Sequence, residues 1–321
     1  MKKISDATNT ISKILIISAH PPIDSELATS WLNMGIHVNV ISKSVKWNDQ
    51  FQSLNPLAEI NLPVEQPDLI VVGHPIDSIY AILMKFQKRW FKVKIVMIHW
   101  WFPKRLPVYY FVKNISVCLY GRKYLNKILG ISSNVAYCPV DTIHFRKKNE
   151  IKNEKRIITI GNKFKERKIM GYDHLINIIE NVHSKEPDTD VVIIGKNKKE
   201  DFPKYVSVIN CNKEEMVDEI NKASVVFFTT TQNLIMNSLQ IAMACERRVV
   251  AFDLEPFREV IRNEVSGFLI PNFDDTKFSE ILLRTLKISN NEMEKLARKS
   301  IIEKCERSYV SSKIIEYSMQ E

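Results

Sequence analysis

The sequence predicts an α/β protein of two doubly wound domains, each a parallel sheet covered by helices on both faces, with the two domains facing each other across a cleft. Short continuous apolar runs alternate with amphipathic segments along the chain. This alternation is typical of buried parallel strands connected by helices. The pattern restarts after about residue 150, and a chain of 321 residues is long enough for two domains that each bury a core.

In the first half, helical spacing of apolar residues predicts helices over residues 25–34 and 79–91, the first ending at Gly35. Buried strands are predicted at residues 13–17, 38–41, 68–73 and 94–99.

A charged stretch over residues 146–156 is interpreted as a linker. We therefore place the first domain at residues 1–150 and the second at residues 151–321, with the last helix as a candidate to return to the first domain. Ligands of open α/β sheets bind beyond the carboxyl ends of the strands, so the site is expected in the cleft. The elements predicted after the linker are strands at 157–161, 190–195, 206–209, 225–228 and 248–252, and helices over 173–184 and 213–222.

The net charge of +9 lies entirely in the first half. Residues 1–150 contain 19 Lys+Arg and 10 Asp+Glu, whereas the remainder contains 27 of each. No acidic residue occurs between Asp77 and Asp141, and this acid-free stretch contains eleven basic residues. A field of one sign attracts anions, whether phosphate, nucleic acid or anionic lipid.

The overall composition, 45% hydrophobic and 26% charged, is that of a soluble globular protein. No apolar run reaches the roughly 18 residues of a membrane-spanning helix, and the first residues lack a secretory apolar core. The five cysteines are scattered without metal-ligand spacing. We therefore expect a cytoplasmic protein with reduced thiols and without a bound metal or cofactor.

The most informative segment is residues 229–245, between the predicted strands at 225–228 and 248–252. It contains Gln232, then Gln240 eight residues later, then Ala242-Met243-Ala244. This frame resembles the nucleotide-sugar signature of glycosyltransferase family 4, which is Glu, seven residues, Glu, then Ala-Met-Ala. In this chain glutamine stands at both acidic positions.

Further segments resemble the same family in the same order. Residues 160–173 resemble its strand, Gly-Arg and Lys-Gly-x-Asp block, residues 137–145 its interdomain crossing, and residues 259–271 the segment after the signature helix. The resemblance implies a retaining glycosyltransferase with two Rossmann-like domains, the GT-B fold. It further implies a nucleotide-sugar donor, such as a UDP- or GDP-sugar, and a glycan or lipid-linked acceptor.

The resemblance also assigns roles to residues of the second domain. Lys163, where the family usually has arginine, and Lys168 match the basic residues beside the donor diphosphate, near Gly161. A helix starting near Asn233 and Leu234 would direct backbone N–H groups at the same phosphates.

Gln232 matches the acid that approaches the donor sugar, and Gln240 the acid that binds the ribose. Glutamine still donates and accepts hydrogen bonds, but it lacks the charge of a carboxylate. In the first domain, His99 stands at a strand end where the family often has a histidine that faces the sugar. A lone histidine at a strand end is commonly structural, so both interpretations stay open.

The loop at residues 18–26 departs from the family because it lacks the usual paired glycines. A close approach of this backbone to a phosphate is therefore not expected. His20 and His74 each precede a proline, and we interpret both as structural.

Aromatic residues are interleaved with the basic residues of the acid-free stretch, a combination that suits an anionic membrane surface. We therefore expect peripheral attachment to the inner face of a membrane. Two alternatives stay open: a non-catalytic nucleotide-sugar or glycan-binding relative, favoured by the two glutamines, and a nucleic-acid-binding protein, favoured only by the basic first half. No nucleic-acid motif is recognisable, so we expect no nucleic-acid partner.

Overall fold

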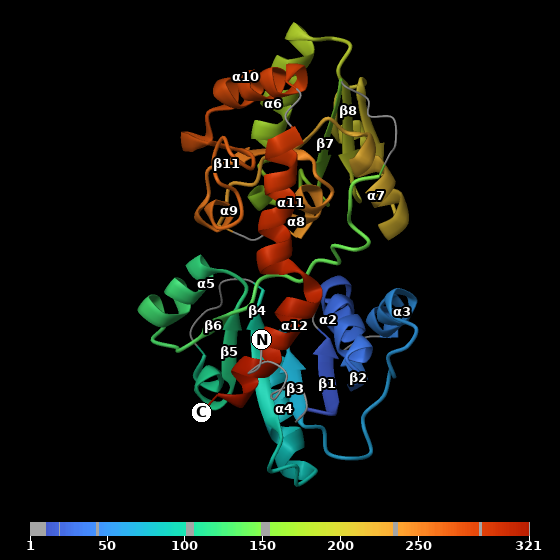
Figure 1. The fold of residues 1–321 in the computed structure, drawn as a ribbon, viewed down its shortest axis with the longest axis vertical. Helices are drawn as coiled ribbons and strands as arrows, with labels where there is room; N and C mark the ends of the chain where they lie inside the picture. Colours follow the sequence, from blue (N-terminus) through green and yellow to red (C-terminus); the bar gives the residue numbers. More distant parts are fainter. Residues whose placement is uncertain are drawn as a thin grey trace. The chain divides into compact units, whose positions relative to one another are not determined.

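The computed structural model describes residues 11–18, 20–42, 45–100, 106–148, 155–233, 237–288 and 291–320. The chain forms two compact units, one of Met1–Pro139 with Lys304–Glu321 and one of Val140–Glu303. Each unit contains one six-stranded sheet whose strands are all parallel, and Figure 1 labels their elements. The predicted α/β class with two doubly wound sheets is therefore confirmed. Within the described residues, no helix has the length and apolar character needed to cross a membrane.

The sheet of the first unit has the strand order β2-β1-β3-β4-β5-β6. The strand predicted at residues 94–99 is β4, and those predicted near residues 13, 38 and 68 are β1, β2 and β3. Polar β5 and two-residue β6 were not predicted. The bounds are β1 Lys13–Ser18, β2 His37–Ser42, β3 Leu69–Val72, β4 Lys94–His99, β5 Lys113–Ser116 and β6 Asn134–Val135.

Prolines set the starts of two helices in the first unit. Helix α2 spans Pro21–Asn33 and α4 spans Pro75–Gln87, so both begin about four residues earlier than predicted. Proline fits the first helical turn because its missing N–H has no intrahelical partner there. The His74 ring accepts a hydrogen bond from the backbone N–H of Ile76 (3.3 Å) and so caps α4. The further helices of this unit are α3 Val45–Leu54, α5 Leu119–Lys123, the π-helical turn η2 Tyr124–Ile128 and α12 Arg307–Met319.

The connection between β4 and β5 covers residues 100–112, of which residue 100 and residues 106–112 are described. Within its described part it forms only the 3-10 turn η1, Pro107–Phe111, which lies beside α4.

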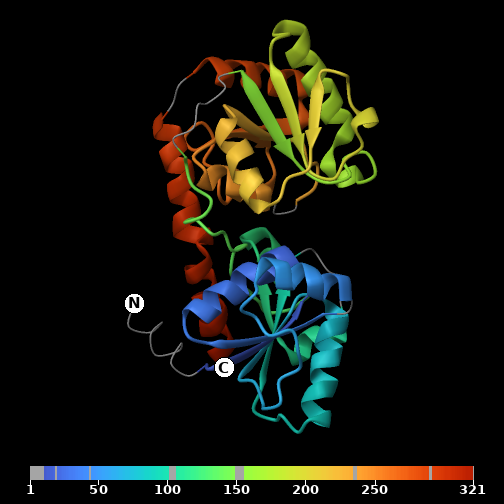
Figure 2. The same ribbon diagram turned by 90° about the vertical axis from the view of Figure 1, so that its right-hand side faces the viewer.

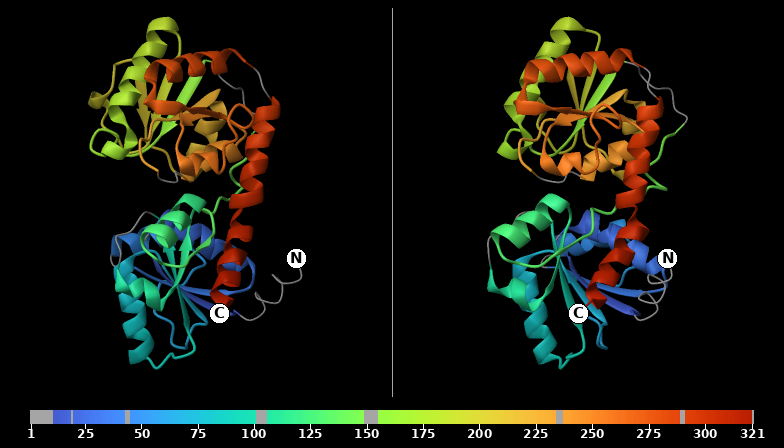
Figure 3. Two further views of the ribbon diagram at one scale, coloured as in Figure 1. Left: turned by 90° about the vertical axis from the view of Figure 1, so that its left-hand side faces the viewer. Right: turned by 60° about the vertical axis from the view of Figure 1, so that its left-hand side comes forward.

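Helix α12 belongs to the first unit although it lies at the end of the chain. It packs on α2 and on strands β4 and β5, as Figure 3 shows. The Trp31 indole N–H donates to the carbonyl of Ser311 (3.3 Å), and Arg307 pairs with Glu26 (3.1 Å). The boundary between the units lies at Pro139, somewhat before the residue 150 of the prediction.

The sheet of the second unit has the order β12-β11-β10-β7-β8-β9. Five of its six strands, all but β12, and its first two α-helices match the predicted ranges to within a residue or two, because these strands are short, mainly apolar runs. The bounds are β7 Arg156–Ile160, η3 Lys168–Met170, α6 Tyr172–Lys185, β8 Asp190–Ile194, η4 Lys199–Asp201, β9 Val206–Ile209, α7 Lys213–Lys222, β10 Val225–Phe228, α8 Asn237–Ala244, β11 Arg248–Phe252, α9 Glu255–Arg258, β12 Phe268–Ile270, η5 Pro271–Phe273, α10 Asp275–Lys287 and α11 Asn291–Cys305.

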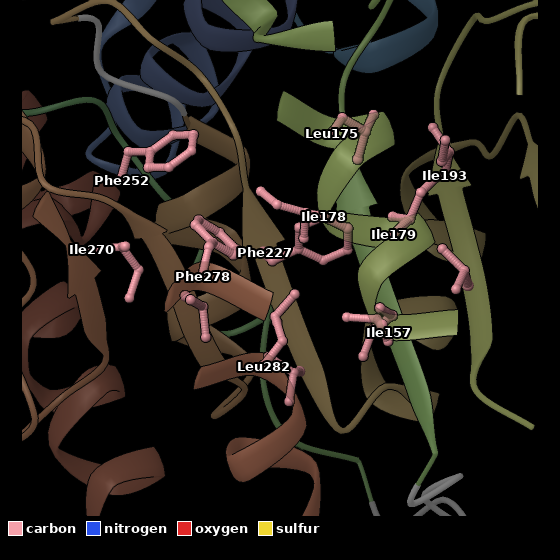
Figure 4. Packing of buried hydrophobic residues seen from close by; sticks show 14 of the residues in the cluster. Ile157, Leu175, Ile178, Ile179, Ile193, Phe227, Phe252, Ile270, Phe278 and Leu282 are labelled. Carbon is pink, nitrogen blue, oxygen red and sulfur yellow. The ribbon is translucent and has the colours of Figure 1, made fainter. Parts of the chain in front are cut away.

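One hydrophobic core fixes the second sheet beneath α6 and α10 (Figure 4). Ile178 and Ile179 from α6 and Phe278 and Leu282 from α10 are fully buried against strand residues such as Phe227. Large buried side chains of this kind contribute about 1.5–3 kcal/mol each relative to exposure. This packing holds the carboxyl ends of β7 and β10 in fixed positions, which matters for the loops that follow them.

Candidate functional site

The strand order of the second sheet identifies where a ligand fits. Strands β8 and β9 follow β7 on one side, and β10, β11 and β12 continue on the other. The chain therefore reverses direction between β7 and β10. Open α/β sheets bind ligands at this switch point, beyond the carboxyl ends of the strands. The two loops of interest are residues 161–171 after β7 and the segment after β10, described to residue 233.

Two asparagines connect the loops after β7 and β8. The Asn162 side-chain oxygen accepts from the backbone N–H of Lys196 (2.7 Å), and the Asn197 amide donates to the carbonyl of Gly161 (2.7 Å). Gly195 makes this approach possible: a Cβ there would lie 2.3 Å from the Gly161 carbonyl oxygen, and its φ is +132°. Sequence reasoning did not find either asparagine, because their partners lie on a neighbouring strand.

Gly161, predicted to bind the donor, has a packing function in the structure. A Cβ at this position would lie 2.3 Å from the Met170 side chain and 2.9 Å from the Phe164 ring. The absence of a side chain therefore lets the loop fold back over the end of β7.

Two hydrogen bonds attach the turn that contains Lys168 to the segment that follows β10. The hydroxyl of Thr229 donates to the carbonyl of Met170 (2.9 Å), and that of Thr230 donates to Ile169 (2.7 Å). Gly171 closes the turn at φ +66°, and a Cβ there would lie 2.0 Å from the Thr229 carbonyl oxygen. The structure thus brings Lys168 next to the segment that continues to Gln232.

Lys163 and Lys168 are both exposed on the loop after β7. Lys163 adopts φ +55°, and its backbone N–H donates to the carbonyl of Lys196 (3.0 Å). Lys165, between them, is paired with Asp201 (2.9 Å), whereas neither Lys163 nor Lys168 contacts a carboxylate of the described residues. Arg167 is also an exposed cation of this loop. It was not predicted as a site residue, although its place next to Lys168 in the sequence could have indicated it.

The two glutamines differ sharply in their surroundings. Gln232 is exposed at the end of the described segment after β10, whereas Gln240 lies on α8 with 1% of its surface exposed. Asn233 is half-buried, and its side-chain oxygen accepts from the backbone N–H of Glu255 (3.2 Å) at the start of α9. Leu234 lies outside the described residues, so the predicted helix start near Asn233 and Leu234 stays a prediction; α8 is described from Asn237.

His99 belongs to the first unit and ends β4. It is 4% exposed, and burial lowers its pKa to about 4, against the opposing effect of the Asn114 hydrogen bond. The Asn114 amide donates to the carbonyls of Tyr109 (2.7 Å) and Val112 (3.0 Å), so its oxygen accepts from His99 Nε2 at 2.9 Å. This arrangement assigns the proton to Nε2.

The tautomer leaves Nδ1 of His99 as a hydrogen-bond acceptor. Nδ1 is buried and has no partner among the described residues, and the same holds for the hydroxyl of Tyr109, whose ring contacts the His99 ring edge-on at 5.1 Å between centroids. A neutral imidazole of this kind can accept a hydrogen bond from a sugar hydroxyl. It cannot donate one without changing its bond to Asn114.

Within the described parts of both units, no group of three or more His, Cys, Asp or Glu side chains is arranged to hold a metal ion. What the second-unit edge presents instead is a set of exposed cationic side chains on loops fixed by hydrogen bonds. Such an edge binds anions by charge and by hydrogen bonding.

Residues 154–287 match the family model described as Glycosyl transferases group 1. This segment contains both loops of the switch point and all the predicted site residues except His99. The chain is therefore a transferase with a glycosyltransferase domain.

Solved structures place the whole chain on the GT-B fold. A glycosyltransferase from Rickettsia africae ESF-5 is 13% identical with a TM-score of 0.74, and the match covers 95% of this chain and 96% of that chain. HepE of Anabaena, solved in complex with UDP-glucose, is 12% identical with a TM-score of 0.72 (94% and 98% covered). Sucrose-phosphate synthase from Thermosynechococcus elongatus is 13% identical with a TM-score of 0.73 (94% and 96% covered). No curated protein matches by sequence.

Proposed function

We propose that the chain moves a sugar from a nucleotide-sugar donor to a glycan or lipid-linked acceptor, and that the donor diphosphate binds at the carboxyl edge of the second sheet. One observation carries this proposal: the turn holding Lys168 is fixed to the segment after β10, at the switch point, with Lys163 and Lys168 exposed and not paired with a carboxylate of the described residues. Cations at this position stabilise the charge that develops on a leaving diphosphate.

The resemblance to glycosyltransferase family 4 supports a reaction with retention of configuration. The bond between the sugar C1 and the phosphate oxygen breaks, and the acceptor oxygen bonds to C1 on the same face. The acceptor proton passes to the leaving phosphate oxygen, so no protein base is required. A UDP-sugar is the first donor to test, because the similar Anabaena protein was solved with UDP-glucose.

In this proposal Gln240 binds the donor ribose, and Gln232 binds the transferred sugar. Asn233, Leu234 and the backbone near Gly161 line the donor. His99 Nδ1 accepts a hydrogen bond from a sugar hydroxyl, a function that its tautomer and its lowered pKa support. The first unit then provides the acceptor side.

We further propose that the first unit contacts an anionic membrane. The support is its charge: residues 1–150 hold 19 basic and 10 acidic residues, and no acid interrupts residues 78–140. Each basic residue near an anionic surface contributes roughly 1 kcal/mol, screened by salt. A lipid-linked acceptor would be met at such a surface.

The test is calorimetric binding of UDP and UDP-glucose, followed by GDP and its sugars, to the wild type and to Lys163→Ala and Lys168→Ala. A hydrogen bond to a charged group contributes about 1.5–3 kcal/mol, so each variant should bind the nucleoside diphosphate roughly tenfold or more weakly. The matched control is Lys185→Ala, an exposed lysine at the opposite end of α6. Unchanged affinity in both loop variants would remove the diphosphate from this edge.

The second candidate function is a non-catalytic nucleotide-sugar or glycan-binding protein. Gln232 and Gln240 favour it, because neither supplies a carboxylate. Incubation of purified protein with a nucleotide-sugar that binds separates the two candidates. Release of nucleoside diphosphate, with an acceptor or by hydrolysis, supports the enzyme; tight binding without turnover across a panel of glycan and lipid-linked acceptors supports the binding protein.

A further inference from the structure

Helix α4 presents an apolar face that no other described element covers. Five large hydrophobic side chains on α4 are exposed, among them Leu83 (61%) and Phe86 (63%). Their spacing of three and four residues places them on one side of the helix, opposite buried Ala81 and Met84. Figure 2 shows α4, in cyan, beside the first sheet. The exposed set is Ile76, Ile79, Tyr80, Leu83 and Phe86.

A groove of about 780 Å³ adjoins this face. It runs along the starts of β4, β5 and β6, at the end of the sheet opposite His99, and it is bounded by α4, η1 and the end of α12. The short turn η1, in the described part of the β4–β5 connection, supplies one of its walls. Its lining includes Tyr109 and Asn114, which also contact His99, and all of it belongs to the first unit, whereas Lys163 and Lys168 belong to the second.

Three lysines line the groove, and its lining contains no acidic residue. Lys85 donates to the carbonyl of Val93 (2.9 Å), and Lys94 contacts the sulfur of Met319 (3.6 Å), which is a weak acceptor. Neither these two nor Lys113 contacts a carboxylate of the described residues. The groove thus concentrates positive charge beside apolar and aromatic walls.

The groove and the apolar face share residues. Phe86 of α4 and Phe111 of η1, the latter 75% exposed, belong to the groove lining and are also exposed hydrophobic side chains. A molecule with a phosphate among the lysines would pass Phe86 and Phe111 on leaving the groove. Its remaining part would lie along the apolar face of α4, so an anionic head joined to an apolar chain fits both.

We propose that this groove binds the phosphate headgroup of an anionic membrane phospholipid, with the apolar face of α4 and Phe111 inserted among the lipid chains beside it. The inference deepens the membrane contact proposed above and names the element and the lipid chemistry. Aromatic rings with adjacent basic residues suit the boundary between headgroups and acyl chains.

Co-sedimentation with vesicles tests the proposal, comparing phosphatidylglycerol–phosphatidylcholine mixtures with pure phosphatidylcholine at low and physiological salt. The groove variant is K94Q/K113Q. Its control is K88Q/K92Q, which removes the same charge from exposed lysines of the same stretch that do not line the groove. We expect the groove variant to bind anionic vesicles at least tenfold more weakly than the control variant. Equal losses would show a diffuse electrostatic field and overturn the groove.

A second pair tests the apolar face. Leu83→Ser should reduce vesicle binding severalfold, whereas Leu57→Ser, also strongly exposed (77%) but outside the face, should leave it unchanged. Equal behaviour of these two variants would overturn insertion of α4. A third experiment adds soluble glycerol phosphate to the vesicle-binding assay. If it competes at millimolar concentration as effectively as lipid does, the groove binds a small phosphate compound and the lipid proposal is wrong.

Nucleotide binding is measured on the same variants, and it separates this inference from the proposed donor site. We expect K94Q/K113Q to bind the nucleoside diphosphate like the wild type, because the groove lies in the other unit from Lys163 and Lys168. Lipid binding without nucleotide binding refutes the donor site alone, and the reverse result refutes the groove alone.

Discussion

The loops beyond the carboxyl ends of the two sheets differ in whether a carboxylate of the protein itself occupies their hydrogen-bond donors. In the first unit, the loop after β1 leads into α2, whose first two residues are prolines without N–H groups. The Asp24 carboxylate accepts from the Ser18 hydroxyl (2.9 Å) and from the His20 backbone N–H (2.8 Å). The start of α2 therefore already holds an anion, which is the protein's own.

In the second unit, the loop after β7 runs from Gly161 to Gly171, and Glu166 is its one acidic residue. Its turns are made by backbone hydrogen bonds and by asparagine side chains. Cationic side chains remain exposed. The comparison teaches that two similar sheets can differ in what their edges leave available. At the first edge the donors of Ser18 and His20 are occupied by the protein's own Asp24 carboxylate. The second leaves cationic side chains exposed, and in the proposed function these bind the diphosphate.

The largest expected effect is at Gly171. Gly171→Ala combines a left-handed φ of +66° with a Cβ 2.0 Å from the Thr229 carbonyl oxygen. The control Gly130→Ala has nearly the same φ (+68°) but meets nothing within 4 Å. The control should cost about 1–2 kcal/mol of unfolding free energy, and Gly171→Ala about 3 kcal/mol or more, with loss of nucleotide binding. Urea unfolding measures both, and equal costs would show that the turn does not need this close approach.

The next effect concerns His99, the buried imidazole at the end of β4. Burial lowers its pKa from 6.5 to about 4, so the unfolded chain binds a proton in this window that the folded chain does not. Stability is then complete above pH 6.5 and falls as the pH falls from 6.5 towards 4. Between pH 7.5 and pH 5 this residue should contribute a loss of about 2 kcal/mol.

The measurement is urea unfolding of the wild type and of His99→Gln at both pH values. The difference between their pH dependences isolates His99 from the other titrating groups. Parallel pH dependence in the two proteins would contradict a buried, neutral imidazole. The glutamine amide should replace the hydrogen bond from His99 Nε2 to Asn114 only incompletely, so we expect the variant to be less stable than the wild type at pH 7.5.

The difference between the two edges was only partly predictable from the sequence. Apolar runs located every strand of the second sheet except β12, because a buried parallel strand is a local pattern. The sequence also indicated Lys163, Lys168 and the lack of glycine after β1, because each of these is a local feature of the chain. The sequence did not indicate the hydrogen bonds made by Thr229 and Thr230 or by Asn162 and Asn197, because tertiary packing determines their partners.

Burial also separated residues that the sequence made equivalent. The resemblance to the family 4 signature matches both Gln232 and Gln240 to acidic positions, yet Gln232 is exposed and Gln240 is only 1% exposed. Helix α8 is apolar on several sides, so its periodicity did not reveal which way Gln240 points. Likewise, β5 (Lys-Asn-Ile-Ser) carries too few apolar residues to be recognised as a strand.

The smallest expected effect distinguishes these two glutamines, and it tests whether the second edge binds a whole nucleotide-sugar rather than a diphosphate alone. A neutral hydrogen bond contributes about 0.5–1.5 kcal/mol. Gln240→Ala should therefore weaken nucleoside diphosphate and nucleotide-sugar alike, by roughly three- to tenfold. Gln232→Ala should leave nucleoside-diphosphate affinity within about twofold of the wild type and lower turnover by roughly tenfold, because in the proposed function its partner is the transferred sugar. Since Gln240 is buried, its variant also needs a thermal unfolding curve, and its affinity is compared at a temperature where both proteins are folded. Gln240→Glu is the informative companion: it introduces the acidic residue of the family 4 signature that this segment resembles, and its carboxylate is tolerated in this buried position only if a polar ligand or neighbour satisfies it. Wild-type affinity and turnover in both alanine variants would remove the glutamines from the site and leave a diphosphate-binding edge without a defined sugar position.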